Sequence, residues 1–369
     1  MLELDIKIPA SPEGSYPIRI GSGLLGSLWP RIEADFGKYS KFVVTDENLV
    51  SAGHLQKLLG ERDIPTFTIS PAGEASKTID TAVSIIEAME KAYLGRDTLV
   101  VALGGGTVGD IAGFAAAVFK RGVPVVQIPT TTVAQADSSV GGKTGVDSSI
   151  SKNAFGAFWH PAGVHIDVAT LTTLDDRQYR AGLVESVKHA IIADADYFDF
   201  LEANLDAVLE RKPDVLEEVA HKNCKIKGGV VETDPREQNL RRILNYGHTI
   251  GHAVESASGF ELLHGEAVAI GIVGAGLIEI EMGLAGDGRL ERIRSILEKL
   301  DVPVRLPRNL AEKNLIDLIK RDKKAVNKWP RFVLISRIGE VYCKDGQYAV
   351  QVAPELVTNV LDKLQREFF

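Results

Sequence analysis

The sequence contains very little cysteine. Cys224 and Cys343 are the only two cysteines in 369 residues, and no CxxC pair occurs. So few thiols argue against a disulfide framework and against a cysteine-rich metal site. The opening residues, MLELDIKIPA, also lack the basic start and the apolar run of a secretory signal. A cytoplasmic protein is therefore expected.

Long apolar runs and an excess of positive charge are missing as well. The longest apolar run, AVAIGIVGAGLIEI at 267–280, is too short and too rich in glycine to span a bilayer. The formal net charge is −8, whereas a nucleic-acid-binding protein usually has a basic face. Neither a membrane nor a nucleic-acid partner is therefore expected. The basic residues form small clusters beside glycines, which suits a small anionic ligand in a local pocket.

The order of apolar patterns predicts two domains, as the length of 369 residues also suggests. Strand patterns at 41–46, 66–70, 98–106, 123–129 and 164–169 alternate with helical patterns at 48–60 and 78–94. They predict an α/β domain with a Rossmann-like parallel sheet over residues 1–174. Residues 175–369 are expected to be mainly α-helical, with helices at 176–194, 196–210, 213–232, 239–257, 264–284, 288–300 and 310–321. The only late strand-like patterns are RFVLIS and YAVQVA.

A glycine-rich turn follows the third predicted strand. Gly104, Gly106 and Gly109 fit GxGxxG between a strand and a helix, where a pyrophosphate could sit on the helix N-terminus. The turn departs from the usual dinucleotide fingerprint, because it is not in the first strand–helix unit and no acid follows about 20 residues later. Asp46, after an earlier strand, could bind the ribose instead. The alternative is a plain glycine-rich turn.

The segment IPTTTVAQADSSVGGKTGVD, residues 128–147, is almost entirely small and polar after its proline. The following SKNAFGAF adds Lys152 and Asn153. Hydroxyls, lysines and accessible backbone amides are the groups that bind a phosphorylated ligand. The alternative is a long surface loop, although loops of this length are usually functional or disordered.

Three histidines gather in LNYGHTIGHAVE and LLHGEAVAIG. His248 and His252 are four residues apart on one helical face, which is a familiar zinc arrangement. The metalloprotease motif HExxH has a glutamate between its histidines, and HTIGH has none, so a metalloprotease is not expected. Candidates for a third ligand are His264, Glu266 and the more distant Glu185. The alternative is a set of hydrogen-bonded structural histidines.

These motifs together resemble the 3-dehydroquinate synthases. LGGGTVGD, KRGVPVVQIPTTTVAQADSSVGGKTGVD, GLVESVKHAII, LNYGHTIGHAVE, LLHGEAVAIG and RDKKA occur in that family's order, from about residue 40 to about residue 340. The resemblance implies an NAD- and zinc-dependent lyase whose active site lies in the cleft between the two domains. Its reaction would convert 3-deoxy-D-arabino-heptulosonate 7-phosphate to 3-dehydroquinate and phosphate, in the shikimate pathway of aromatic amino acid biosynthesis. A homodimer is also implied.

The resemblance divides the histidines between two roles. It implies that Zn²⁺, for which Co²⁺ could substitute, is bound by Glu185, His248 and His264. It places His252 in the substrate pocket as a catalytic group and not as a ligand. The spacing of the histidines alone does not make this distinction.

Other site residues are implied by the same motifs. Substrate-pocket positions are Asp137, Lys143, Asn153, Lys188, Lys227, Arg241, Asn245 and Lys324 or its neighbour Lys323. Phosphate contacts are Lys152 and Arg121, the latter from a second subunit. NAD-binding positions are Asp46, Asn48, Glu74, Lys77, Gly105, Gly106, Thr107, Asp110, Thr130, Thr131, Lys143, Lys152, Thr173 and Leu174. The chain departs from the family at Gln178, usually a glutamate, which leaves one cofactor contact unsettled. VESVKH also replaces the usual AEVIKY, which is expected to change only the packing.

Three rival functions remain at this stage. A metal- and NAD-dependent polyol dehydrogenase would not need the basic set Lys152, Arg121 and Lys227. A sister cyclase acting on another heptulose phosphate, such as sedoheptulose 7-phosphate, would differ in the residues that face the substrate carboxylate, where Arg241 favours a dehydroquinate synthase. A non-catalytic nucleotide-binding protein would not need the ionisable pocket residues.

Overall fold

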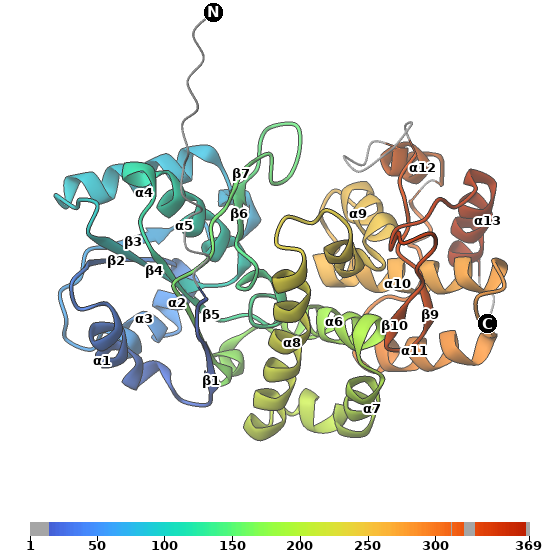
Figure 1. Ribbon diagram of the computed structural model, residues 1–369, viewed down its shortest axis with the longest axis horizontal. Helices are drawn as coiled ribbons and strands as arrows, with labels where there is room; N and C mark the ends of the chain where they lie inside the picture. The colour runs from blue at the N-terminus through green and yellow to red at the C-terminus, as the bar shows by residue number, and fades with distance from the viewer. Residues whose placement is uncertain (1–14, 311, 321–328, 367–369) are drawn as a thin grey trace, which may run out of the picture.

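The computed structural model describes residues 15–310, 312–320 and 329–366 (Figure 1). Its first half contains a six-stranded sheet in the order β1-β8-β5-β4-β2-β3, and all neighbouring pairs are parallel. The strands are β1 (Ile18–Gly21), β2 (Ser40–Asp46), β3 (Thr66–Ile69), β4 (Thr98–Gly104), β5 (Val125–Pro129) and β8 (Gly163–Asp167). The predicted Rossmann-like parallel sheet is therefore confirmed.

Helices cover both faces of this sheet. Because side chains alternate along a strand, β4 sends Val100 and Ala102 into one apolar cluster and Val101 and Leu103 into another. This double burial explains why the strand is a continuous apolar run. The first cluster includes residues of α4 (Ile79–Lys91) and α5 (Gly106–Val118); the second includes residues of α1 (Leu25–Phe36) and α3 (His54–Leu59). The short α2 (Glu47–Ser51) joins β2 to α3.

The polar middle segment is folded more tightly than a surface loop. Residues Ala134–Ser138 form a π-helical turn, η3, and Gln135 is buried where it donates to the carbonyl oxygens of Pro129 and Asp167. β6 (Lys143–Val146) and β7 (Phe155–Phe158) then form an antiparallel hairpin. The alternative of a long surface loop therefore does not hold for most of this segment, because the side-chain amide of Gln135 satisfies buried backbone groups there.

The second half is mainly helical, as predicted. Its helices are α6 (Asp176–Ala193), α7 (Ala195–Leu209), α8 (Pro213–Thr233), α9 (His248–Ala257), α10 (His264–Glu281), α11 (Asp287–Lys299), α12 (Glu312–Lys320) and α13 (Pro354–Gln365). The 3₁₀ segments of the chain are η1 (Glu74–Ser76), η2 (Phe119–Arg121), η4 (Val168–Thr173) and η5 (Leu240–Asn245). The strand predicted over RFVLIS is reduced to β9 (Ile335–Arg337), which pairs with β10 (Glu340–Val341). YAVQVA forms only an isolated bridge, between Phe332 and Val350.

The helix expected over 239–257 is broken in two. η5 ends at Asn245, and α9 begins at His248 after Gly247, whose φ is +76°. Only glycine adopts this backbone conformation without strain. A Cβ at Gly247 would also lie 2.9 Å from the backbone nitrogen of Ile272 on α10. The break therefore places His248 at the first turn of its own helix, against α10.

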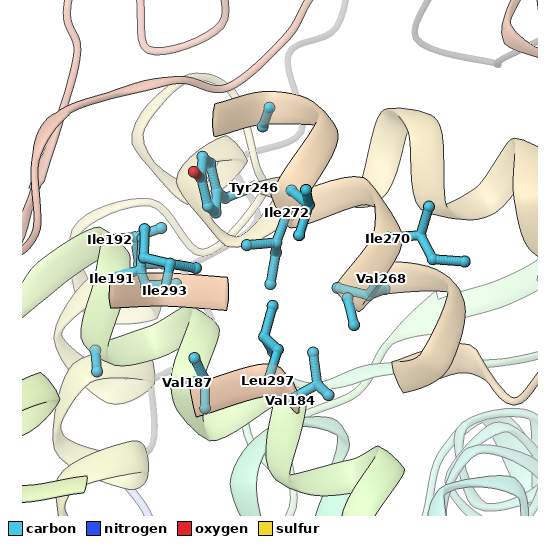
Figure 2. Packing of buried hydrophobic residues seen from close by; sticks show 14 of the residues in the cluster. Val184, Val187, Ile191, Ile192, Tyr246, Val268, Ile270, Ile272, Ile293 and Leu297 are labelled. Carbon is cyan, nitrogen blue, oxygen red and sulfur yellow. The ribbon is translucent and has the colours of Figure 1, made fainter. Parts of the chain in front are cut away.

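Helix α10 forms the centre of the second half. Every residue from Gly265 to Glu279 is buried. Figure 2 shows Ile272 of α10 directed toward Leu297 of α11, close to Val187 of α6. A Cβ at Gly271 would lie 1.9 Å from the carbonyl oxygen of Gly247, and one at Gly265 would lie 1.8 Å from that of Ala181. These two glycines therefore allow the backbones of α9 and α6 to touch α10.

In Figure 1 the sheet and the C-terminal helices lie on opposite sides of α8. The largest apolar cluster nevertheless joins the two halves, because it includes Val164 and Ile166 of β8. The domain limits 1–174 and 175–369 stay a prediction. Within the described ranges, no helix combines the length and the apolar composition that crossing a membrane requires.

Candidate active site

Three helices of the second half bring one carboxylate and two imidazoles together. Nε2 of His248 lies 3.7 Å from Oε1 of Glu185, and Nε2 of His264 lies 3.4 Å from the same oxygen. This oxygen is buried and has no hydrogen-bond partner among the described residues. The other carboxylate oxygen of Glu185 accepts a hydrogen bond from Lys188, one turn along α6. A buried carboxylate oxygen without a donor requires a cation or proton nearby.

The tautomer of His248 supports a metal site. Its Nδ1 lies 3.0 Å from the carbonyl oxygen of Tyr246, which can only accept, so Nδ1 carries the proton. In the neutral ring, Nε2 then directs a lone pair toward Glu185. Burial first, and then the charge of Lys188, hold the pKa of His248 well below its ordinary value, which favours this neutral form. Two imidazole nitrogens and one carboxylate oxygen are a ligand set that suits zinc, so the residues present fit a divalent cation.

His252 lies in the same cluster but on its exposed side. Its ring centroid is 5.2 Å from that of His248 and 5.8 Å from that of His264. The potential ligand atoms of the three histidines lie within 4.8 Å of one another. Geometry therefore brings together both predicted sets, the three histidines and the set that includes Glu185. The other early candidate, Glu266, instead pairs with Arg177 and caps its own helix at the backbone nitrogen of Leu263.

Glu255 also belongs to this cluster, although it was absent from the sequence prediction. Its Oε2 lies 3.4 Å from Nδ1 of His264, and its Oε1 lies 2.9 Å from Nζ of Lys152. Burial alone would raise the pKa of Glu255, but the hydrogen bond from His264 and the charges of His264 and Lys152 lower it to about 2. The signal that could have revealed it is its position seven residues after His248, two turns along one helical face.

A second buried network surrounds Asp137. Its Oδ1 lies 2.6 Å from Nζ of Lys227 and 3.6 Å from Nε2 of His189. Burial raises the pKa of Asp137, but the charges of Lys227 and Lys188 outweigh it and hold the pKa well below its ordinary value. His189 is fully buried, and its Nδ1 lies 3.1 Å from Oδ1 of Asn223. The change from the family's usual AEVIKY does not only alter the packing, because Ser186, where that motif has valine, accepts a hydrogen bond from Nδ2 of Asn223 at 2.8 Å.

Three further predicted substrate residues lie in η5 and β6: Arg241 and Asn245 belong to η5, and Lys143 begins β6. Lys143 pairs with Glu237, and Nδ2 of Asn245 donates to Oε1 of Glu237 at 2.8 Å. Glu237 was also absent from the sequence prediction, because only tertiary packing brings it to Lys143. Arg241 is buried and donates to the carbonyl oxygens of Gly141 and Pro235, while its Nε has no partner in the described chain. Arg241 therefore supports the backbone of the polar segment.

Other predicted residues are not joined to these networks. Arg121 is exposed at the end of η2, with a φ of +70°. Asn153 is exposed, and its backbone nitrogen donates to Oδ1 of Asp147 at 2.6 Å. Gln178 is exposed in the first turn of α6. Lys323 and Lys324 lie outside the described residues.

The predicted NAD-binding residues follow the carboxyl ends of the parallel strands, where open α/β sheets bind ligands. Asp46 ends β2 and accepts from the backbone nitrogens of Asn48 and Leu49, while Gly105 caps α5 after β4. Burial raises the pKa of Asp46 above its ordinary value, and these two hydrogen bonds oppose the rise. Two contacts connect neighbouring loops, Nζ of Lys77 to Oδ2 of Asp110 at 2.7 Å and Oγ1 of Thr107 to Oε2 of Glu74 at 3.2 Å.

Two features of this edge fit a bound dinucleotide. Oγ1 of Thr130 is buried and has no hydrogen-bond partner among the described residues. A Cβ at Gly105 would lie 2.9 Å from Cγ2 of Thr131, so only glycine allows the turn after β4 to approach Thr131 this closely. Leu174 and Thr173 follow β8, and Oγ1 of Thr173 lies 2.6 Å from Nε2 of His54. His54 was not predicted as a residue that positions this loop.

Two adjoining family models match residues 67–325 of the chain. Residues 67–181 match the family described as 3-dehydroquinate synthase N-terminal, and residues 182–325 match 3-dehydroquinate synthase C-terminal. The chain is 43% identical to the 3-dehydroquinate synthase of Symbiobacterium thermophilum, over 96% of this chain and 99% of the relative. It is 44% identical to that of Desulforamulus reducens, over 89% and 92% respectively.

Solved structures agree with this relationship. A 2-epi-5-epi-valiolone synthase from Streptomyces hygroscopicus, with NAD⁺ and Zn²⁺ bound, is 28% identical with a TM-score of 0.85, covering 97% of this chain and 99% of that one. A 2-deoxy-scyllo-inosose synthase complexed with carbaglucose-6-phosphate, NAD⁺ and Co²⁺ is 26% identical with a TM-score of 0.83, covering 94% and 96%. A glycerol dehydrogenase from Schizosaccharomyces pombe, 15% identical with a TM-score of 0.66 over 94% and 88%, shares the fold alone. With two adjoining family matches and near-full-length relatives above 40% identity, this chain belongs to the 3-dehydroquinate synthase family.

Proposed function

We propose that the protein is a 3-dehydroquinate synthase of the shikimate pathway, a lyase that converts 3-deoxy-D-arabino-heptulosonate 7-phosphate to 3-dehydroquinate and phosphate. The observation that carries this proposal is the position of Lys188. This lysine is buried beside Glu185, next to the metal-fitting cluster, and its charge also acts on Asp137. Cationic groups for an anionic substrate thus adjoin the metal-fitting set, as a reaction on a sugar phosphate requires.

The proposed metal is zinc, bound by Glu185, His248 and His264. When bound, zinc supplies a Lewis acid that polarises a substrate hydroxyl. Support comes from the buried oxygen of Glu185 that faces both histidines and from the valiolone synthase that binds Zn²⁺. His252 is proposed to face the substrate, because it is the most exposed of the three histidines and can accept a hydroxyl proton there.

The proposed redox cofactor is NAD, held along the carboxyl edge of the sheet. When bound, NAD supplies a transient hydride acceptor. The residues that would hold it are Asp46, Asn48, Glu74, Lys77, Gly105, Gly106, Thr107, Asp110, Thr130, Thr131, Lys143, Lys152, Thr173 and Leu174. The two sister cyclases that bind NAD⁺ support this assignment.

The chain's own side chains are proposed to bind and orient the two anionic groups of the substrate. Four lysines are each paired with a carboxylate in this structure: Lys143 with Glu237, Lys152 with Glu74 and Glu255, Lys188 with Glu185, and Lys227 with Asp137. The substrate would share these lysines with their carboxylates. Asn153, Asn245 and Arg241 would hold the segments around the substrate in place. An oxygen of the departing phosphate would take the proton from the neighbouring carbon atom of the substrate. Much of the rate then comes from positioning.

A homodimer is proposed as well, in which Arg121 of one subunit contacts the phosphate in the other. The exposure of Arg121 outside the networks of its own chain supports this arrangement. A cytoplasmic location stays a prediction.

The decisive experiment follows phosphate release with NAD far below the substrate concentration. A cyclase returns the hydride to the substrate, so 3-deoxy-D-arabino-heptulosonate 7-phosphate should release phosphate to completion without lasting NADH absorbance. Accumulation of NADH with phosphate still attached would identify a polyol dehydrogenase instead. Sedoheptulose 7-phosphate serves as the control substrate, and faster turnover with it would favour the sister cyclase.

A further inference from the structure

We propose that Glu255 is a positioning residue for the metal site, because its carboxylate holds His264 with Nε2 directed at Glu185. This inference rests on the metal site proposed above and concerns a residue outside its ligand set.

The two nitrogens of His264 face two different carboxylates. Nε2 lies 3.4 Å from Oε1 of Glu185, and Nδ1 lies 3.4 Å from Oε2 of Glu255. A cation that takes the Nε2 lone pair leaves the ring proton on Nδ1, where Glu255 is the acceptor. Such a carboxylate–histidine pair fixes the tautomer and the ring orientation, and it makes the imidazole a stronger ligand.

The two proposed histidine ligands differ in their acceptors. Nδ1 of His248 donates to the backbone carbonyl of Tyr246, whereas Nδ1 of His264 faces a full negative charge. The ring of His248 is oriented by a backbone carbonyl only two residues before it. His264 has 34% of its side chain exposed, against 11% for His248, and therefore depends more on a partner for its orientation.

Lys152 fixes the carboxylate of Glu255 in turn. Its Nζ lies 2.9 Å from Oε1 of Glu255, which directs Oε2 to His264. The same Nζ lies 3.2 Å from Oε1 of Glu74 and 4.5 Å from the centroid of the Phe260 ring. Glu255 itself is only 6% exposed, so its carboxylate is held firmly between these neighbours. The expected phosphate-binding lysine is thereby linked to a proposed metal ligand.

The test measures the zinc dissociation constant of the full-length protein by competition with a chromophoric chelator. Glu255→Gln keeps the shape of the side chain and removes its charge, and Glu255→Ala removes the acceptor. Loss of such an outer partner typically weakens metal binding by about 10–100-fold, and we expect this range for Glu255→Ala with a smaller loss for Glu255→Gln. The absorption spectrum of the cobalt-loaded protein should also change, because the ring of His264 is reoriented.

The matched control is Glu74→Gln, which removes the other carboxylate that Lys152 contacts but touches no histidine. Its zinc affinity should equal that of the unmodified protein. If both Glu255 variants keep the zinc affinity and the cobalt spectrum of the unmodified protein, the inference is wrong. The proposed metal site itself would not be contradicted by that result. Lys152→Met should weaken zinc binding less than Glu255→Ala, because the lysine acts on His264 only through Glu255. A larger loss in Lys152→Met than in Glu255→Ala would also overturn the inference. An unmodified protein that binds no zinc would refute the proposed metal site itself.

Discussion

Charged side chains in the site are held by neighbours of opposite charge. Lys188 is 1% exposed and Glu185 is fully buried, so each charge depends on the other where water is excluded. Removing one member of such a pair leaves an uncompensated buried charge. Substitutions in the site are therefore informative when they remove a neutral ligand or an exposed group, as the histidines allow.

Replacing His264 with alanine tests the proposed metal site. The variant should lose most of its bound zinc, because one of the three proposed ligands is gone and the oxygen of Glu185 keeps only one imidazole opposite it. Metal content after dialysis measures this directly. His221→Ala, an exposed histidine on α8, is the control and should retain its zinc. Full occupancy in His264→Ala would refute the assignment.

Replacing His252 with alanine separates the two roles given to the histidines. The variant should keep its zinc but lose turnover by about 10²–10⁴-fold, the usual contribution of an acid–base group. Metal analysis and phosphate release under saturating substrate are measured on the same sample. A protein that emerges metal-free would show that the four-residue spacing, and not the family resemblance, identifies the ligands.

At the scale of elements, close backbone contacts between helices place the site. Gly271 of α10 touches the carbonyl oxygen of Gly247, directly before α9 begins at His248. The start of α9 can take its position only if α10 has no side chain at this point. The same reasoning applies to Gly265 against Ala181 of α6, next to His264.

Gly271→Ala should therefore destabilise the protein and weaken zinc binding together. Overpacking typically costs about 1–3 kcal/mol, and here the obstructing atom is backbone, which moves least easily. Urea unfolding and zinc competition measure the two effects. Gly228→Ala on α8 is the matched control, because its added Cβ meets nothing within 4 Å. It should be neutral or stabilise by about 0.5–1 kcal/mol. Equal stability of the two variants would contradict this account.

The edge of the sheet predicts a dependence of stability on pH. His165 of β8 is buried opposite Arg19 of β1, and neither ring nitrogen has a partner in the described part of the chain. Burial first, and then the charge of Arg19, lower the pKa of His165 from 6.5 to about 4. A depressed pKa means that the unfolded chain takes up a proton that the folded chain refuses. Stability is therefore fully present above pH 6.5 and is lost as pH falls toward 4.

The contribution of His165 is at most about 3 kcal/mol, from 1.36 kcal/mol for each pKa unit. His165→Gln should flatten the fall in the free energy of unfolding between pH 7 and pH 4.5, measured by urea titration. His221→Gln should keep the slope of the unmodified protein. Identical slopes in all three proteins would show that His165 does not titrate in this range.

The sequence predicted the strands that contain several consecutive buried apolar residues. β4 is a continuous buried run and β2 has the apolar centre Phe-Val-Val, and both were found. β1 and the β6–β7 hairpin are short and rich in polar residues or glycine, and they were not found. The break before α9 depends on contact with α10, which no local pattern reveals.

In the site, the sequence offered His264, Glu266 and Glu185 as candidates for a further ligand, and the resemblance selected His264 and Glu185. Glu255 was missed although it lies two turns after His248 on one helical face. Glu237 was missed because only a long-range contact brings it to Lys143. The contacts of His189 with Asp137 and Asn223 were not predicted because they are long-range as well.

At the scale of the whole molecule, the net charge of −8 coexists with a site rich in lysine. The buried lysines are balanced by carboxylates within the same clusters, so the site carries local positive groups without a basic surface. Arg121 differs from them because it is exposed and lies outside these clusters. A second subunit would give this arginine an anionic partner.

Mixing two inactive variants tests the proposed dimer. Arg121→Ala lacks the residue supplied to the partner's site, and His252→Ala lacks a residue of its own site. After subunit exchange, a heterodimer contains one site with both residues intact, so phosphate release should partly recover. Each variant incubated alone is the control. Absence of recovery after mass spectrometry has shown mixed dimers would contradict the shared site.

The ligands proposed for the metal come from three separate helices, α6, α9 and α10. A cation bound there would link α6 to α9 and α10, which are distant from α6 in the sequence. It would dissociate whenever any one of these helices unfolded locally. By mass action, a ligand that binds only the folded chain raises the free energy of unfolding by about 4 kcal/mol at a thousandfold excess over its dissociation constant. Chelation should therefore lower the melting temperature, and the amides of α6, α9 and α10 should exchange with deuterium sooner than those of β4.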